Sequence, residues 1–177
     1  MNKYNQNLLS LYVHWPYCES KCPYCDFNSH VNEKIEVNDW IKSYKNQLLA
    51  MKEELIENNI NFRHLDTIFF GGGTPSLMPL KIVESIIDIS KKIFGFKKDI
   101  EITLEANPSS YESKKFIKFK QIGINRISIG AQSLNDKYLK FLGRLHNITD
   151  VKIALNDASE TFENISVDLI YAFHGQK

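Results

Sequence analysis

Apolar residues gather in five short segments of this chain, each followed by turn residues. The segments are rich in β-branched and aromatic side chains, a composition typical of β-strands. The fifth is partly apolar on both faces, because Ile165, Val167, Leu169 and Tyr171 alternate with Ser166, Asp168 and Ile170. Parallel strands that are covered on both sides have this pattern. We therefore predict strands at residues 9–14, 65–70, 99–105, 125–129 and 165–171.

A helical repeat of apolar residues separates these strands. After the first strand, five apolar residues at spacings of four, four, three and four share one helix face. They are Trp40, Tyr44, Leu48, Met51 and Leu55. Asn38 is the predicted N-cap of this helix, with Asp39 in its first turn.

The later helices are predicted in the same way. The residues Ile82, Ile86, Ile89 and Ile93 form the apolar face of a second helix. A third helix at 110–122 turns Phe116, Phe119 and Ile122 inward and ends at Gly123. Shorter helices are expected at 134–142 and 151–155.

Strands and helices thus alternate along the whole chain, which indicates an α/β fold with about five parallel strands and right-handed crossovers. An open doubly wound sheet and a segment of a barrel both fit this order. No linker interrupts it, so residues 1–177 are expected to form one domain. The sequence ends six residues after Tyr171, and we expect the domain to be truncated before its C-terminal part, with the fifth strand uncovered.

Composition narrows the functional classes. The 177 residues include 22 Lys and Arg against 21 Asp and Glu, a net charge of +1. This balance gives no electrostatic reason to expect nucleic acid or an anionic membrane as a partner. No apolar run approaches the ~18 residues of a transmembrane helix, and the polar N-terminus does not resemble a secretory signal. A cytoplasmic location is expected.

The three cysteines of the chain, Cys18, Cys22 and Cys25, lie within eight residues of one another. An odd, clustered set in a reducing compartment indicates a metal or redox site rather than a disulfide framework. Three thiolates suit an iron–sulfur cluster and leave one iron corner open to another ligand. Zinc is the alternative, with His14 or His30 as the fourth ligand that a structural site requires.

The spacing Cys18-x-x-x-Cys22-x-x-Cys25, with Tyr24 before the third cysteine, resembles the signature of radical S-adenosylmethionine (SAM) enzymes. The surrounding residues, LYVHWPYC at 11–18 and KCPYCDFNSH at 21–30, are similar to the oxygen-independent coproporphyrinogen III oxidase family, and closest to its heme chaperones. Further matches follow in the family's order. They are FGGGTPS at 70–76, EANP at 105–108, IGAQS at 129–133, LGRLH at 142–146 and SVDLIY at 166–171.

The resemblance implies an incomplete (β/α)6 partial barrel with a [4Fe-4S] cluster on the three cysteines. It also implies one SAM site and allows a second. The first would involve Tyr12, Gly72, Gly73 and Glu105, and the second Tyr24, Gly73, Thr74, Gln132, Arg144 and Asp168. Independently, Arg144 is one of only three Arg among the 22 basic residues, and its planar fork suits a carboxylate. His14 and His146 are expected to be structural.

Three functions remain open at this point. The first is a heme chaperone that carries a [4Fe-4S] cluster and SAM. The second is an oxygen-independent coproporphyrinogen III oxidase, which would use the reduced cluster and SAM for radical decarboxylation. The resemblance favours the chaperone, because the oxidases have a fourth cysteine where this chain has Phe27. The third is an inactive truncated or split-gene fragment, so whether the chain is an enzyme is left open.

The implied partners are SAM, heme or a porphyrinogen, and an electron donor such as flavodoxin. A second chain that completes the fold is a further expectation. The family's Tyr-Gly turn reads Tyr171-Ala172 here, and its HNxxYW element does not occur. Heme is therefore expected to bind the complete protein rather than these residues alone.

Overall fold

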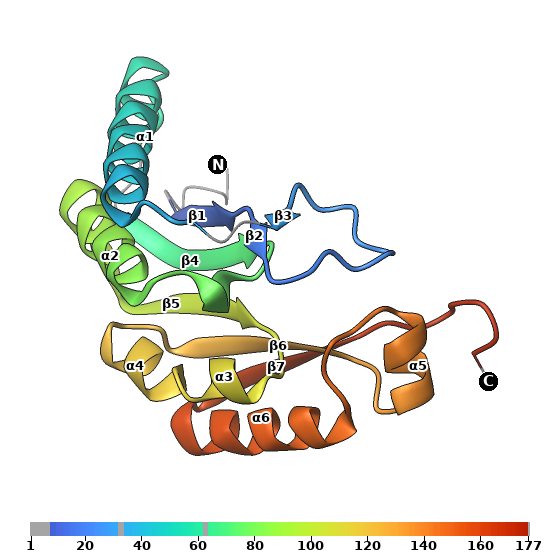
Figure 1. Ribbon diagram of the computed structural model, residues 1–177. Coiled ribbons are helices and arrows are strands. Elements are labelled where there is room, and N and C mark those ends of the chain that lie inside the picture. The colour runs from blue at the N-terminus through green and yellow to red at the C-terminus, as the bar shows by residue number, and fades with distance from the viewer. Residues whose placement is uncertain (1–7, 32–33, 62–63, 177) are drawn as a thin grey trace, which may run out of the picture.

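Five parallel strands form a curved sheet in the spatial order β1-β4-β5-β6-β7 (Figure 1). The computed structural model describes residues 8–31, 34–61 and 64–176. The strands are β1 (Leu8–Trp15), β4 (His64–Gly72), β5 (Phe96–Ala106), β6 (Arg126–Gln132) and β7 (Asn164–Leu169). All five predicted strands are confirmed, with shifted ends: β6 continues three residues further than predicted, and β7 ends before Tyr171.

Within the described residues, six helices and one 3₁₀ turn connect the strands. They are α1 (Val37–Glu57), η1 (Pro75–Leu77), α2 (Leu80–Phe94), α3 (Ser110–Ser113), α4 (Phe116–Gln121), α5 (Asp136–Phe141) and α6 (Ile148–Thr161). The longer helices run along the outer side of the curved sheet, whereas α5 lies near the ends toward which the strands point (Figure 1). None of the helices in the described ranges is long and apolar enough to cross a membrane.

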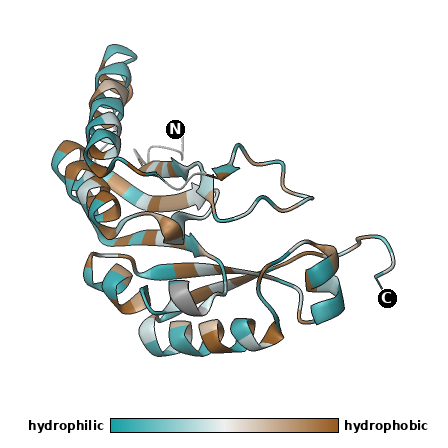
Figure 2. Cartoon of the chain, viewed as in Figure 1, coloured by the Kyte–Doolittle hydropathy of each residue, from teal (hydrophilic) through white to brown (hydrophobic). Residues whose placement is uncertain are grey.

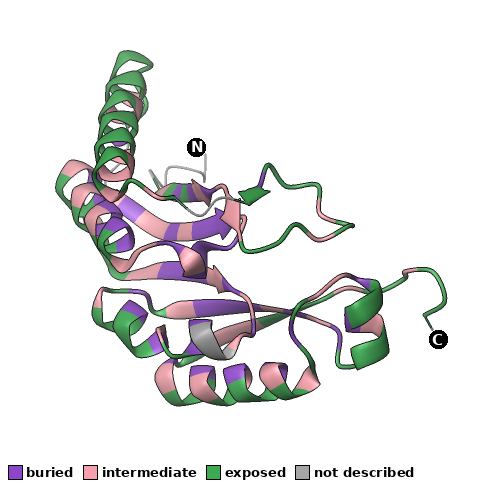
Figure 3. Ribbon diagram, viewed as in Figure 1, coloured by how far each residue is buried: buried purple, intermediate pink, exposed green. Residues whose placement is uncertain are grey.

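Helix α1 presents the predicted apolar face to the rest of the molecule. Leu48 is buried on this face, and the other four residues of the pattern pack against the core. The outer length of α1 is hydrophilic and exposed (Figures 2 and 3). The predicted N-cap is wrong: the helix begins at Val37, so Asn38 lies inside it and Glu36 is the N-cap. The Glu36 carbonyl accepts hydrogen bonds from the first-turn amides of Asp39 and Trp40, which starts the helix two residues early.

The single helix predicted at 110–122 is instead two short helices, α3 and α4. The break lies at residues 114 and 115, after Ser113. Just before it, the buried carboxylate of Glu112 accepts hydrogen bonds from the Ser76 hydroxyl and the Asn107 backbone amide. Phe116 and Phe119 are fully buried in α4 as predicted, and Gly123 follows the helix with φ +110°.

The core lies between the sheet and its outer helices. The residues Ile68, Phe70, Leu104 and Ile127 of the strands are fully buried, as are Ile82 and Ile86 of α2. The last strand differs. On β7, Val167 is 42% exposed and Leu169 is 56% exposed, and Tyr171 just beyond it is 84% exposed. The expectation that these apolar side chains are left uncovered is confirmed.

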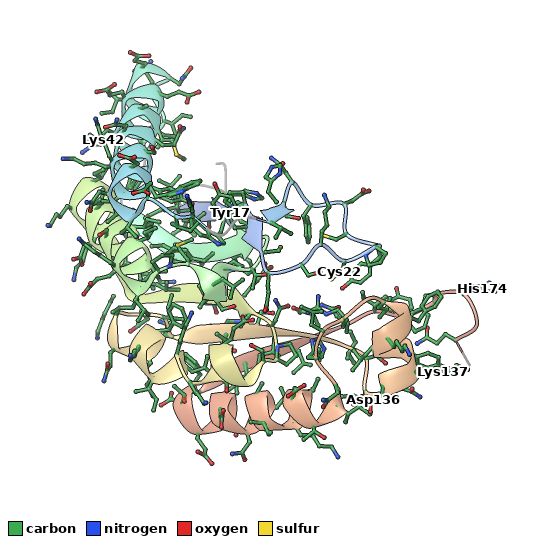
Figure 4. The ribbon with its side chains drawn as sticks, viewed as in Figure 1. Tyr17, Cys22, Lys42, Asp136, Lys137 and His174 are labelled. Atoms are coloured by element: carbon green, nitrogen blue, oxygen red, sulfur yellow. The ribbon has the colours of Figure 1, made fainter. Side chains whose placement is uncertain are left out.

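Two very short strands, β2 (Tyr17–Cys18) and β3 (His30–Val31), pair in parallel and were not predicted. Two residues are too few to produce a recognisable alternation of side chains. Residues 18–29, which we call the cysteine loop, leave β2 and return to β3. This loop projects beyond the ends of the strands, and Cys22 lies on it (Figures 1 and 4).

Candidate functional site

The carboxyl ends of β4, β5, β6 and β7 border a cavity of about 750 Å³ beside the cysteine loop. Parallel α/β folds place ligand sites at this end of the sheet. Every predicted site residue except Tyr12 lines the cavity. These residues are Cys18, Cys22, Cys25, Tyr24, Gly72, Gly73, Thr74, Glu105, Gln132, Arg144 and Asp168.

The three cysteines are unpaired thiols of intermediate burial on the cavity wall. A backbone hydrogen bond of 3.0 Å from Cys25 N to Cys22 O forms a tight turn between two of them. Among the described residues, no three His, Cys, Asp or Glu side chains are grouped closely enough to hold a single metal ion. A cubane cluster would take each of the three thiolates at a different iron.

Gly72 and Gly73 at the end of β4 are required by the packing of the chain itself. Gly72 has φ +114°, and a Cβ there would lie 2.7 Å from the Trp15 carbonyl oxygen. A Cβ on Gly73 would lie 2.7 Å from the Tyr17 carbonyl oxygen and 3.0 Å from Cys18 Sγ. Glycine at these positions therefore lets β4 approach the segment that leads into the cysteine loop.

Tyr12 lies outside the cavity lining. Its side chain is 56% exposed and stacks on Phe69, which does line the cavity, with 6.1 Å between ring centroids. The two histidines within the motifs have structural partners, as predicted. His14 Nε2 lies 2.9 Å from the Asn28 carbonyl oxygen, and His146 Nε2 lies 3.1 Å from the Ala131 carbonyl oxygen.

Glu105 and Asp168 place two carboxyl groups on one side of the cavity. Burial raises the pKa of Glu105 to about 7, and the charge of Asp168 adds to this effect, while a hydrogen bond with the Gly72 backbone opposes it. Asp168 accepts hydrogen bonds of 3.0 and 3.2 Å from the Ser128 hydroxyl. The pair therefore offers acceptor oxygens and negative charge suited to a cationic or hydroxyl-bearing ligand.

Arg144 connects the cysteine loop to the strand ends. Its Nη1 donates to Cys22 Sγ and to the Tyr24 hydroxyl, each at 3.3 Å. Its Nη2 donates to the Asn107 side-chain oxygen, and also to the Gly130 carbonyl oxygen at 3.4 Å. The buried Nε has no partner among the described residues. The guanidinium thus keeps one donor free beside the cavity that it lines.

Comparison with known proteins decides the family. Residues 12–177 match the model of the radical SAM superfamily. The chain belongs to the radical SAM superfamily.

The most similar relatives include heme chaperones. The chain is 42% identical to the heme chaperone HemW of Haemophilus influenzae over 170 residues, covering 95% of this chain and 44% of that protein. It is 38% identical to the HemW of Escherichia coli over 173 residues, with the same two coverages. The chain therefore spans less than half the length of these relatives.

A solved structure of the Escherichia coli coproporphyrinogen III oxidase HemN, described as a radical SAM enzyme, has the same architecture. The TM-score is 0.82 at 26% identity, and the match covers 98% of this chain and 39% of that chain. The five-stranded sheet thus corresponds to part of the radical SAM (β/α) barrel, as the resemblance implied.

The donor set fits the groups that the radical SAM family implies. Three free thiols on one loop provide soft ligands for iron, and the cavity beneath them combines glycine backbone, carboxyl groups and a guanidinium. Gln132 is also in place at the end of β6, with a backbone φ of +63°. A non-glycine residue in this left-handed region is strained, and such strain collects at functional sites.

Several polar residues that line this cavity were not predicted from the sequence. They are Asn107, Arg126, Ser128 and Ser166. The Ser128 hydroxyl accepts a hydrogen bond of 2.8 Å from Ser166, and Arg126 Nη2 donates to Ser166 at 2.9 Å. Arg126 and Ser128 alternate with buried Ile127 and Ile129 along β6. That alternation in the sequence could have predicted a strand with one polar face, which the structure turns toward the cavity.

Proposed function

We propose that this chain is the cluster- and SAM-binding part of a HemW-type heme chaperone. The observation that carries the proposal is the placement of three cysteine thiols on the wall of one cavity, at the carboxyl ends of the parallel strands β4 to β7. In this proposal Cys18, Cys22 and Cys25 hold a [4Fe-4S] cluster, and residues 1–177 act as the radical SAM core domain.

The cavity residues supply complementary contacts for SAM. The backbone at Gly72 to Thr74 borders the cysteine loop, so it can approach the methionine part of a ligand that caps the open iron corner. Glu105, once ionised, can accept hydrogen bonds from hydroxyl or ammonium groups. Tyr12 contributes to this first site through the Phe69 ring on which it stacks.

A second SAM molecule is part of the proposal, at the wall formed by Tyr24, Gly73, Thr74, Gln132, Arg144 and Asp168. All six line the same cavity. The Arg144 fork is suited to a carboxylate, and Asp168 is suited to a cationic or hydroxyl group. When bound, a reduced [4Fe-4S] cluster supplies the electron for reductive cleavage of SAM.

The chaperone is favoured over a coproporphyrinogen III oxidase by the residue at position 27. The oxidases that this chain resembles have a cysteine there, whereas Phe27 lines this cavity and is 64% exposed. The 38–42% identity to HemW proteins also exceeds the 26% identity to HemN. Transfer of heme and receipt of an electron from a donor such as flavodoxin would be activities of the whole protein.

The cluster assignment is tested by anaerobic reconstitution with iron and sulfide. We expect about four irons per chain and an electron paramagnetic resonance signal after reduction. A Cys22→Ala variant should lose most of this signal, and Ser20→Ala, a neighbouring change that removes no thiol, should retain it. A Cys22→Ala variant with the full cluster signal would refute the assignment.

The cavity assignment is tested by titrating the reduced, reconstituted protein with SAM. We expect SAM to change the resonance spectrum, because one iron corner has no protein ligand. The change should be weaker in Asp168→Asn, which keeps the size of this cavity residue but removes its charge. A spectrum that excess SAM leaves unchanged would contradict the proposal.

A further inference from the structure

The turn after α5 is fixed by its own backbone. Gly143 has φ +68°, its amide donates to the Lys140 carbonyl at 3.1 Å, and the Arg144 amide donates to the Leu139 carbonyl at 2.9 Å. This pair of bonds is the Schellman arrangement that ends helices at glycine. We call residues 142–145 the Gly143 turn. Its geometry sets the direction in which the Arg144 side chain leaves the helix.

The Gly143 turn packs directly on the cysteine loop. A Cβ at Gly143 would lie 2.5 Å from Pro23 Cδ and 3.1 Å from Pro23 Cγ, so the backbone of the turn meets the proline ring at close range. The next residue, Arg144, donates to Cys22 Sγ and the Tyr24 hydroxyl. Two consecutive residues of the turn therefore contact three consecutive residues of the loop.

The Gly143 turn is itself held against the ends of the strands. His146 just beyond it is buried and bonds to the Ala131 carbonyl at the end of β6. The second nitrogen of the Arg144 fork reaches Gly130 of the same strand and Asn107 after β5. The cysteine loop has little packing of its own, since most of residues 19–28 are exposed. Because the Gly143 turn contacts both the strand ends and the cysteine loop, it fixes the position of the loop relative to the sheet.

We propose that Gly143 and Arg144 are positioning residues that lock the cysteine loop in the shape that lets its three thiolates share one cluster. Gly143 does so by steric fit to Pro23, and Arg144 does so by hydrogen bonds on either side of it. The proposal rests on the proposed function in one respect, the [4Fe-4S] cluster on the three cysteines. It concerns how firmly the chain retains that cluster.

Gly143→Ala tests the steric contact between Gly143 and the Pro23 ring. The added methyl group must displace Pro23, so we expect a chelator to remove iron from the reconstituted protein at least about tenfold faster, in line with the usual cost of disturbing ligand-supporting residues. The matched control is Gly175→Ala. It places alanine at φ +77° with nothing within 4 Å, so it imposes similar backbone strain without a collision. All measurements are made without SAM.

A second change isolates the collision. In the double variant Gly143→Ala with Pro23→Ala, the ring atoms that the new methyl group meets are gone. We expect this variant to lose iron more slowly than Gly143→Ala alone. Restoration of the slow rate would assign the defect to the contact, because the strained backbone at position 143 is the same in both proteins.

Arg144→Lys tests the hydrogen bonds from Arg144 to the cysteine loop. It also provides a test of the proposal if Gly143→Ala does not fold. Lysine keeps the charge but loses the fork, so we expect faster iron loss and a more negative reduction potential, since hydrogen bonds to cluster sulfurs raise the potential. A wild-type chain that takes up no cluster would overturn the proposed function and the lock together. A normal cluster with iron loss and potential unchanged in Gly143→Ala and Arg144→Lys would overturn the lock alone.

Discussion

Replacement of Glu105 should change how the stability of this protein depends on pH. Burial first, and the Asp168 carboxylate second, raise the pKa of Glu105 to about 7 from an ordinary value of 4.5. The folded state therefore binds the Glu105 proton more tightly than the unfolded state does. It follows that the contribution of Glu105 to the free energy of unfolding falls as pH rises from 4.5 to about 7, and the full cost is present above pH 7.

The size of this cost follows from the pKa and the exposure. A fully buried carboxyl group with this pKa would cost about 3 kcal/mol when ionised. Glu105 is partly exposed, so solvent screening reduces the cost to about 1–2 kcal/mol. Glu105→Gln keeps the size and an acceptor oxygen but removes the charge. We expect this variant to be about 1–2 kcal/mol more stable than wild type at pH 8 and nearly equal to it at pH 4.

The assay is urea unfolding followed by circular dichroism between pH 4 and pH 8. The quantity of interest is the difference between wild type and variant, because groups common to both proteins, such as His146, cancel. Asp168→Asn is the companion variant. It removes the charge that adds to the rise in the Glu105 pKa, so the loss of unfolding free energy between pH 4 and pH 8 should become smaller. A difference between wild type and Glu105→Gln that does not vary with pH would refute the reasoning.

Three further changes test the fold by urea unfolding or calorimetry. Phe70→Ala, at a fully buried position of β4, should lower the free energy of unfolding by about 3–5 kcal/mol; a loss under 1 kcal/mol would contradict that burial. Asn147→Ala removes a capping box at the start of α6 and should cost about 1 kcal/mol, whereas the exposed Asn156→Ala of the same helix should cost less. Gln132→Gly should be about 1 kcal/mol more stable than Gln132→Ala, because only glycine relieves the φ of +63°; the reverse order would argue against strain at that residue.

The periodic spacing of apolar residues predicted the strands and helices that bury one regular face. All five main strands and the faces of α1 and α2 were recognised from such patterns. The pattern did not reveal the break between α3 and α4, and it could not reveal that Glu112 beside the break is bonded to Ser76, 36 residues earlier in the chain. It also could not reveal β2 and β3, whose pairing brings together residues separated by the whole cysteine loop.

The position of the candidate site was predictable because parallel strands deliver their carboxyl ends to one edge. The partners of its residues were not. The bond between Arg126 and Ser166 depends on the register of β6 against β7, and local sequence does not specify register in an irregular pair of strands. The reason for glycine at positions 72 and 73 was not predictable either. The motif alone does not distinguish close packing of the chain on itself, which the structure shows, from close contact with a ligand.

The link between Arg144 and Cys22 joins residues 122 positions apart, and this separation imposes an order on biosynthesis. The three thiols leave the ribosome early, whereas the residue that holds their loop is made long afterwards. During that interval the nascent chain carries free cysteines on an exposed segment, where thiolates are open to oxidation and to stray metals. Insertion of the proposed cluster is therefore best timed after the Gly143 turn has docked, so synthesis of that turn sets the earliest point at which the loop would hold the cluster firmly.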